Sequence, residues 1–218
     1  MQGWPALRVC LFLLACALNS GSAESHWSQQ GPPPPPPPPR GRPGPSRLDA
    51  AAIADHLQKV RRHLEEVKPR DPDCEKLLAI ARRTLDRADQ KAQAKDLLAT
   101  DRLIAAVDAF LHAAEQPSHL AGGPKGPVPQ AREVADHLQR VYFRLEQADF
   151  FAGSSGEADA ESLPALARKS YEHARKAYDS GRWFAADEYA KSADDTIRGL
   201  ENLAQAAVPE PPPPPRPQ

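Results

Sequence analysis

The sequence predicts an all-α fold of six helices, arranged as two tandem three-helix units. Apolar residues recur at spacings of three and four along the middle of the chain, which is the period of amphipathic helices. In addition, the stretch IADHLQKVRRHLEE at residues 53–66 returns as VADHLQRVYFRLEQ at residues 134–147, with eight of the fourteen positions identical. Such a repeat indicates an internal duplication, in which the second half of the chain copies the fold of the first.

The N-terminal residues 1–23 have the pattern of a secretory signal peptide that is cleaved near Ala23. Arg8 precedes a short apolar run, and small residues follow it. The run has about ten residues, whereas a membrane-spanning helix needs about twenty, so we expect no transmembrane segment. A second interpretation is a lipoprotein, because LLAC at residues 13–16 resembles a bacterial lipobox with Cys16 as the lipid anchor. Both interpretations place the chain outside the cytoplasm, in the periplasm or secreted.

Two proline-rich segments flank the predicted folded part. Residues 24–47 contain PPPPPPPPRGRPGPSR, and residues 207–218 end in PEPPPPPRPQ. Proline runs favour an extended polyproline II conformation that builds no packed core, so we expect a disordered linker and a disordered tail. Such segments serve either as stiff spacers or as ligands for aromatic-lined grooves.

The first unit is expected to span residues 48–116 and to contain three helices. Pro69 ends the first helix, and the pair Asp71–Pro72 is a favourable start for the second. The apolar stripes are Ile53, Leu57, Val60, Leu64 and Val67, then Leu77, Ala81, Leu85, Ala88 and Ala92, and finally Leu97, Ile104, Val107 and Leu111.

A linker at residues 117–130, rich in proline and glycine, separates this unit from the second, which is expected at residues 131–206. Ser162 is a suitable cap for the fifth helix, and Ser180–Gly181 breaks the chain before the sixth. The stripes are Val134, Leu138, Val141, Leu145 and Ala148, then Leu163, Ala167, Tyr171, Ala174 and Tyr178, and finally Trp183, Ala186, Ala190, Ala193, Ile197, Leu200 and Ala204.

The stretch ARKAYDSGRWFAADEYAKSA at residues 174–193 resembles a tetratricopeptide-type α-hairpin. The resemblance covers about residues 163–196. It rests on four residues of that family's small-residue pattern, Tyr178, Gly181, Ala186 and Ala193, which match when one residue is deleted before the glycine. In the first copy Lys95 replaces the glycine, and the extra leading helix and the linker also depart from a continuous repeat array. The resemblance implies a scaffold that binds proteins or peptides, without catalytic residues.

Composition and motifs do not favour an enzyme or a nucleic-acid-binding protein. The formal net charge of -1 supplies no general attraction for nucleic acid. Cys74 is the one cysteine outside the predicted signal peptide, and its acidic neighbours Asp73 and Glu75 oppose a reactive thiolate. We therefore expect no enzymatic activity and no cofactor, with Cys74 a free or intermolecular thiol.

Two histidines occupy the same position in the two copies. His56 and His137 each follow an aspartate within the repeated stretch. If the first helices of the two units pack together, these histidines could share a metal ion; otherwise they are polar residues beside the core stripe. They support an alternative function, a periplasmic protein that binds a small ligand or a metal.

Aromatic residues are concentrated in the second unit. Phe143 and Phe150 lie seven residues apart and opposite the core stripe, where the first copy has Arg62 and Pro69. A helix with two apolar faces is either sandwiched between elements or presents a binding surface. The leading hypothesis is an exported scaffold that binds a protein or peptide, or itself, through an aromatic surface. The residues predicted for this surface are Tyr142, Phe143, Phe150, Phe151, Trp183 and Phe184.

Overall fold

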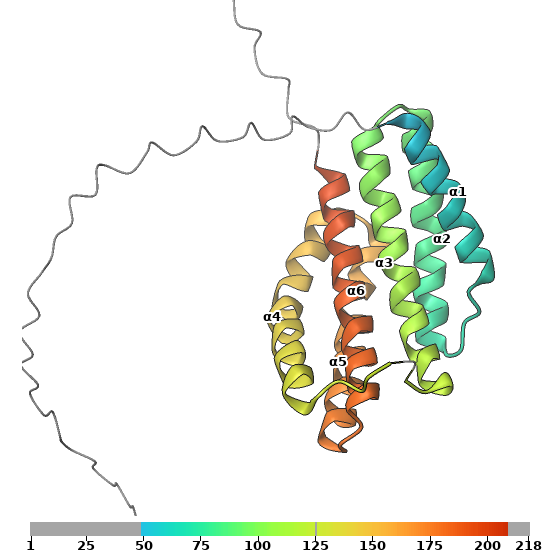
Figure 1. Ribbon diagram of the computed structural model, residues 1–218. Coiled ribbons are helices and arrows are strands. Elements are labelled where there is room, and N and C mark those ends of the chain that lie inside the picture. Colours follow the sequence, from blue (N-terminus) through green and yellow to red (C-terminus); the bar gives the residue numbers. More distant parts are fainter. Residues whose placement is uncertain (1–48, 125, 209–218) are drawn as a thin grey trace, which may run out of the picture. The chain divides into compact units, whose positions relative to one another are not determined.

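The computed structural model describes residues 49–124 and 126–208 (Figure 1). Every described residue belongs to one compact body. The predicted signal peptide, the possible lipid anchor Cys16, the linker at residues 24–47 and the tail from residue 209 onward lie outside the described residues.

The prediction of an all-α fold with six helices is confirmed. Helices make up 86% of the described residues, and none of these residues forms a strand. The elements are α1 (Ala50–Glu66), α2 (Pro72–Gln93), α3 (Leu97–Gly122), α4 (Ala131–Ser155), the short 3-10 helix η1 (Ala158–Ser162), α5 (Leu163–Asp179) and α6 (Trp183–Ala207).

Helices α1 to α4 begin with side-chain contacts to backbone N–H groups, whereas α5 and α6 begin without one: the hydroxyl of Ser162, expected as the cap of α5, donates to the carbonyl of Asp159 at 3.1 Å instead. Asp49 accepts a hydrogen bond from the N–H of Ala51 at the start of α1, and Asp71 and Asp96 cap α2 and α3 in the same way. At the start of α4, the side chain of Glu133 accepts from the N–H of Gln130 at 2.9 Å. Gln130 is the counterpart of Asp49 in the repeat, so the leading helices of the two units begin at equivalent residues.

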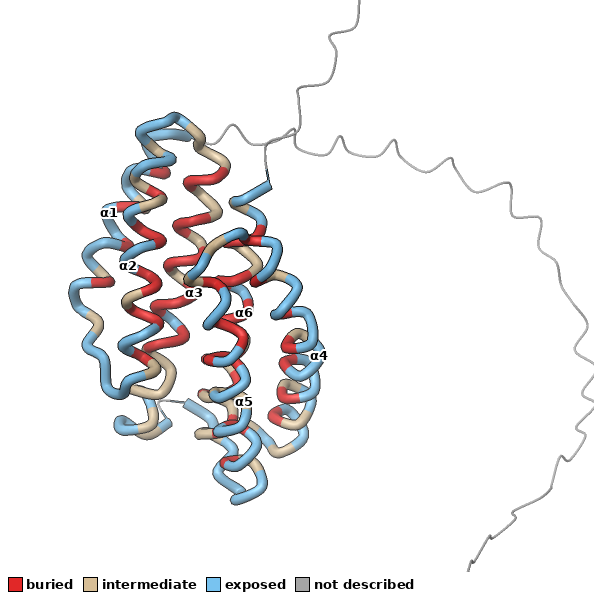
Figure 2. The backbone as a smooth tube through the Cα atoms, turned by 180° about the vertical axis from the view of Figure 1, so that it is seen from behind, coloured by how far each residue is buried: buried red, intermediate tan, exposed pale blue. Residues whose placement is uncertain are grey.

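The six helices form two groups of three (Figure 1). Helices α3 and α6 run antiparallel and share the most extensive interface between any two elements. Helix α1 packs at one edge against α3 and α2, and α4 packs at the opposite edge against α6 and α5. On α1 and α4 the buried residues follow one side of the helix, whereas on α3 and α6 they occur on more than one side (Figure 2). The core is therefore continuous through the α3–α6 interface.

The α3–α6 interface depends on a close contact between a large and a very small residue. Phe110 of α3 is fully buried, and a Cβ atom added to Gly199 of α6 would lie 2.3 Å from its ring. Glycine is therefore required at this position because the ring already occupies the space of a side chain. The leading helices of the two units align at an offset of 81 residues, and the second and third helices align at an offset of 86. The equivalent positions of the other unit therefore hold Thr196 and Ala113, so the two halves of the interface are not identical.

Helix α3 continues past the position at which the sequence suggests that it ends. The linker was expected at residues 117–130, but α3 extends through Pro117 to Gly122. Proline has no N–H with which to bond the carbonyl of Ala113, four residues earlier. The hydroxyl of Ser192 on α6 donates to that carbonyl instead, at 2.8 Å. A tertiary contact therefore satisfies the group that Pro117 leaves without its helical partner.

Candidate binding surface and groove of the second unit

The aromatic residues opposite the core stripe of α4 are exposed. Phe143 is 55% exposed and Phe150 is 72% exposed, whereas Val134, Leu138 and Val141 on the other side of the helix are buried. Of the two interpretations that the sequence leaves open, sandwiching and exposure, the structure shows exposure. Helix α4 thus contributes one face to the core and presents large apolar side chains on another.

Four of the six predicted surface residues lie together on α4, and we call them the α4 aromatic cluster: Tyr142, Phe143, Phe150 and Phe151. The ring centroids of Tyr142 and Phe143 are 6.0 Å apart, and those of Phe150 and Phe151 are 5.8 Å apart. Phe151 is half-buried against the core, so its ring supports that of Phe150 from beneath. The cluster covers about two turns of the helix.

The structure does not bring Trp183 and Phe184 to this cluster. Both lie at the start of α6, and His137 of α4 bonds Asp187 of α6 at 2.9 Å. This contact places Trp183 level with about Glu133, which is ten residues or roughly 15 Å from Phe143 along the helix axis. Trp183 is 39% exposed and Phe184 is half-buried. They therefore lie near the start of α6, apart from the α4 aromatic cluster.

A groove between α4 and α5 adjoins the cluster. Two adjacent pockets of about 620 Å³ and 370 Å³ share the rings of Tyr142 and Tyr171, whose centroids are 6.2 Å apart. The larger pocket is lined by Ala135, Leu138, Gln139, Tyr142, Tyr171, Arg175, Tyr178 and Asp179. The smaller one is lined by Tyr142, Leu145, Glu146, Arg168, Tyr171 and Glu172. We call both together the tyrosine groove.

Sequence reasoning assigned Tyr171 and Tyr178 to the core stripe of the fifth helix and so missed their place in the groove. Both are half-buried, and each packs one part of its ring against the core. The available signal was the residue type, because tyrosine has an apolar body and a polar tip and is favoured where a surface is half-buried.

The first unit contains an equivalent pocket with different chemistry. A pocket of about 310 Å³ between α1 and α2 is lined by Arg61, Leu64, Glu65, Arg82, Leu85 and Asp86. When the two units are aligned, each of these six residues corresponds to one residue that lines the smaller pocket of the tyrosine groove. Two replacements distinguish the pockets: Arg61 corresponds to Tyr142, and Leu85 corresponds to Tyr171.

The structure places the two candidate metal-ligating histidines apart. His56 on α1 bonds Asp108 of α3 at 2.7 Å, and His137 on α4 bonds Asp187 of α6 at 2.9 Å. Their helices lie at opposite edges of the bundle (Figures 1 and 2). Within residues 49–124 and 126–208, no group of three or more histidine, cysteine or acidic side chains could hold a metal ion.

These histidines belong to a set of polar contacts that fasten the leading helix of each unit to its third helix. His63 of α1 bonds Glu115 at 2.8 Å, and its counterpart Arg144 of α4 bonds Glu201 at 2.9 Å. Glu201 is the counterpart of Glu115, so the contact recurs in both units. Arg144 also pairs with Asp194. The sequence signal for this arrangement was a carboxylate at every seventh position of the third helices, at Asp108 and Glu115 and again at Asp187, Asp194 and Glu201.

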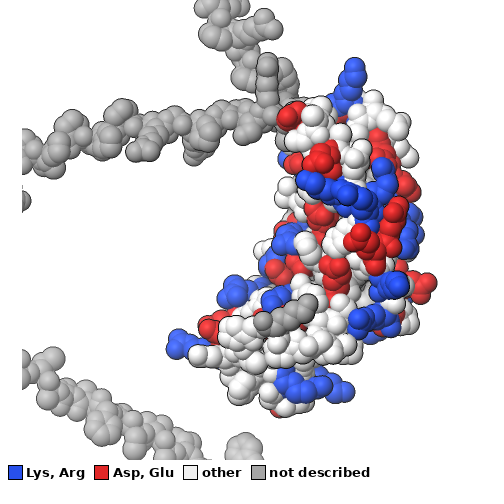
Figure 3. Space-filling view, turned by 45° about the vertical axis from the view of Figure 1, so that its right-hand side comes forward, with Lys and Arg blue, Asp and Glu red and all other residues white. Residues whose placement is uncertain are grey.

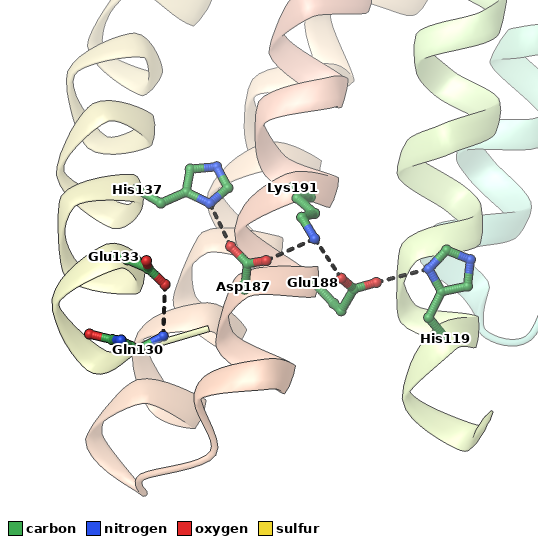
Figure 4. Close-up of polar contacts among 7 residues, drawn as sticks. All are labelled: His119, Gln130, Glu133, His137, Asp187, Glu188 and Lys191. Carbon is green, nitrogen blue, oxygen red and sulfur yellow. Dashed lines mark hydrogen bonds and ion pairs between the residues drawn. The ribbon is translucent and has the colours of Figure 1, made fainter. Parts of the chain in front are cut away.

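In the second unit the contacts extend into a network across three helices (Figure 4). Lys191 of α6 bonds both Asp187 and Glu188 at 2.8 Å, and Glu188 accepts a further hydrogen bond from His119 of α3 at 2.8 Å. Burial alone would raise the pKa of Asp187, but hydrogen bonds from His137 and Lys191 hold that pKa below 3.8. The network therefore keeps Asp187 charged and pairs both carboxylates, which suits a structural role.

The Cys74 thiol is protonated at neutral pH. Burial and a hydrogen bond to Asp71 raise the pKa of Cys74 to about 12. The sulfur lies 3.2 Å from the Asp71 carboxylate and 3.4 Å from the carbonyl oxygen of Ala114. The thiol thus donates hydrogen bonds at the base of α2 rather than acting as a nucleophile in this conformation.

Charges of both signs are interleaved on the face of the molecule that Figure 3 shows. The described helices include none with the length and apolar character of a membrane span.

The chain matches no family model, no curated protein and no solved structure.

Proposed function

We propose that this chain is an exported, non-enzymatic helical scaffold that binds a protein or peptide, or a second copy of itself, through the α4 aromatic cluster. The observation that carries the proposal is the exposure of Phe143 and Phe150 on a helix whose opposite face already fills the core. The equivalent positions of α1 are Arg62 and Pro69, so the fold itself does not require aromatic rings there.

The cluster has the composition of an interface centre. Aromatic side chains are enriched in interfaces, and complete burial of a phenylalanine side chain contributes about 1.5–3 kcal/mol. More than half of each of the two rings is available for burial by a partner. The tetratricopeptide-type resemblance of residues 163–196 supports the same function, since that family binds proteins and peptides.

Export is supported by the pattern of residues 1–23, which resembles a signal peptide. The intact mass of the exported protein tests it. Cleavage after Ala23 yields a chain that begins at Glu24, whereas lipidation at Cys16 yields a heavier product that partitions with membranes. Recovery of the uncleaved chain in the cytoplasm alone would contradict export.

The binding surface is tested with the double variant Phe143→Arg/Phe150→Glu. We expect the variant to remain helical by circular dichroism and to lose the association that light scattering, or affinity capture from the native envelope or medium, detects with the unchanged protein. The matched control is Arg62→Glu, which changes charge at the equivalent position of α1 and should leave association intact.

Two outcomes would count against the proposal. If the double variant unfolds, the rings contribute to the core and the cluster is not a free surface. If the unchanged protein and the folded variant retain the same partners to the same extent, binding takes place elsewhere on the molecule.

A further inference from the structure

The smaller pocket of the tyrosine groove combines two aromatic rings with two acidic side chains. Tyr142 and Tyr171 lie on its two sides, and the buried Leu145 contributes to its floor. Glu146 and Glu172 also line it, and neither is paired with a cation of the described residues. Arg168, the one basic residue of this pocket, is engaged by Asp149 at 2.5 Å.

These features match one ligand chemistry. An extended proline-rich segment is preorganised as polyproline II and docks into grooves lined by aromatic rings. A carboxylate beside such rings recognises an arginine that follows the prolines, through charge-assisted hydrogen bonds. The pocket therefore suits a segment in which consecutive prolines precede an arginine.

The chain carries two such segments, Pro32–Pro39 before Arg40 and Pro211–Pro215 before Arg216. The second directly follows α6, which belongs to the same unit as the pocket, and is therefore chosen as the occupant. Residues 209–218 read PEPPPPPRPQ, in which Pro211–Pro215 are consecutive and Arg216 follows them. This segment lies outside the described residues, while α6 ends at Ala207.

The length of the segment matches the distance along the helix axis from the end of α6 to the level of the pocket. The hydroxyls of Ser170 and Ser192 are 3.5 Å apart, and the ring centroids of His173 and Tyr189 are 5.3 Å apart, which fixes the antiparallel register of α5 and α6. In this register Tyr171 is level with Lys191, sixteen residues or about 24 Å from Ala207 along the helix axis. Eight residues of polyproline II, from Val208 to Pro215, cover about 25 Å.

We propose that the smaller pocket of the tyrosine groove binds residues 209–217 of the same chain, with the prolines on Tyr142 and Tyr171 and Arg216 at Glu172. This inference rests on the proposed function, because both take the second unit as the binding unit. The tail would occupy the tyrosine groove and leave Phe143 and Phe150 accessible to a partner. The equivalent pocket of the first unit has Arg61 and Leu85 in place of the tyrosines, so it lacks the aromatic pair.

The test uses the tyrosine ring signals of the full chain by nuclear magnetic resonance. The chain has four tyrosines, of which Tyr142 and Tyr171 line the smaller pocket, whereas Tyr189 stacks on His173 outside the groove and serves as an internal reference. In a tail variant with Pro211→Ser, Pro212→Ser, Pro213→Ser, Pro214→Ser and Pro215→Ser, we expect the Tyr142 and Tyr171 signals to move and the Tyr189 signal to stay. Unchanged Tyr142 and Tyr171 signals would overturn the inference.

A synthetic peptide of residues 209–218 identifies the occupant. Added to the tail variant, it should return the Tyr142 and Tyr171 signals toward their positions in the unchanged chain. The same peptide with Arg216→Glu should bind about threefold to fivefold more weakly, the effect of one exposed ion pair. Equal affinity of the two peptides, or binding of the first peptide without movement of these signals, would contradict the proposed arrangement.

Two further variants separate this inference from the proposed function. Tyr142→Arg/Tyr171→Leu copies the pocket of the first unit into the second and removes both reporter rings, so peptide binding to this variant is measured by titration calorimetry. Added to the tail variant, these two substitutions should abolish binding of the peptide. Phe143→Arg/Phe150→Glu should abolish partner association and leave the peptide response unchanged. If Phe143→Arg/Phe150→Glu loses the peptide response and Tyr142→Arg/Tyr171→Leu still binds the peptide, the groove is not the binding site.

Discussion

The leading helices α1 and α4 share one construction and present different surfaces. Both begin at equivalent capping positions, bury equivalent stripes and are fastened to the third helix of their unit by polar contacts. On α1, Arg61 pairs with Asp89 of α2 at 2.6 Å. On α4 the counterparts are Tyr142 and Arg175, and both line the open tyrosine groove.

This comparison shows which positions of the unit the fold constrains and which it leaves free. On the leading helices, residues that face the core or the third helix keep their character, because their substitution would create cavities or unpaired charges. On the outer face of the leading helix Arg61 and Arg62 correspond to Tyr142 and Phe143, and at the rim of the groove Leu85 corresponds to Tyr171. These positions are therefore the ones at which the surfaces of the two units differ most.

The largest effect is expected at the interface that the two units share. Gly199→Ala should lower the free energy of unfolding by about 1–3 kcal/mol, because the added methyl group would overlap the buried ring of Phe110. Gly153→Ala on α4 is the matched control, since nothing lies within 4 Å of the added Cβ atom. The control should stabilise the protein by up to about 1 kcal/mol. Urea unfolding measures both, and equal stability of the two variants would contradict the packing described.

The next effect concerns the contacts of the leading helices. Arg144→Ala should destabilise by about 1–2 kcal/mol, because it leaves Asp194 and Glu201 without their shared guanidinium. The equivalent substitution in α1, His63→Ala, removes a single pairing with Glu115 and should cost less than about 1 kcal/mol at pH 7. Chemical denaturation of both variants at the same pH makes the comparison. A larger loss of stability in His63→Ala than in Arg144→Ala would contradict this expectation.

A third difference is a buried carboxylate that only the second unit has. Burial raises the pKa of Asp195 above 3.8, while the equivalent residue of the first unit is the buried Ala109. Because the folded state favours the protonated form, this carboxyl stabilises folding at acidic pH and destabilises it as the pH rises through the folded-state pKa. Asp195→Asn should therefore increase stability at pH 7, and the difference from the unchanged protein should vanish below about pH 3.8. A pH series of unfolding curves tests this, and a destabilised Asp195→Asn at pH 7 would contradict it.

Replacement of Asp187 by asparagine should change the free energy of unfolding at pH 7 in the opposite direction. The pKa of Asp187 lies below 3.8 because hydrogen bonds from His137 and Lys191 outweigh its burial. This carboxylate therefore stabilises the fold above about pH 3.8, and the contribution is lost as the pH falls through the folded-state pKa. Asp187→Asn should be destabilised at pH 7 and should approach the unchanged protein in strong acid. A variant as stable as the unchanged protein at pH 7 would show that the network of Figure 4 contributes little.

The smallest effect on stability is expected at the groove rim. Tyr142→Arg restores the residue type of the first unit at a position that is 48% exposed, so the free energy of unfolding should change by no more than about 0.5 kcal/mol. The same urea series measures it. A loss above about 1 kcal/mol would show that Tyr142 is a core residue and that the groove is part of the packing.

The local pattern of residues was sufficient to predict the helices and their buried faces. The stripe Ile53, Leu57, Val60 and Leu64 is buried as expected, and so is its counterpart on α4. The outward position of Phe143 followed from the same periodicity. These features depend on neighbours three or four residues away, which the sequence displays directly.

Other features were decided by contacts between residues far apart in the chain. Helix α3 passes through Pro117 because Ser192, seventy-five positions later, satisfies the carbonyl that the proline leaves free. His56 and His137 are separated because α3 and α6, rather than α1 and α4, form the centre of the bundle. The tyrosine groove likewise exists only where α4 and α5 pack side by side. Periodicity determines which face of a helix is apolar, but the partner of each face is selected by the packing of the whole core.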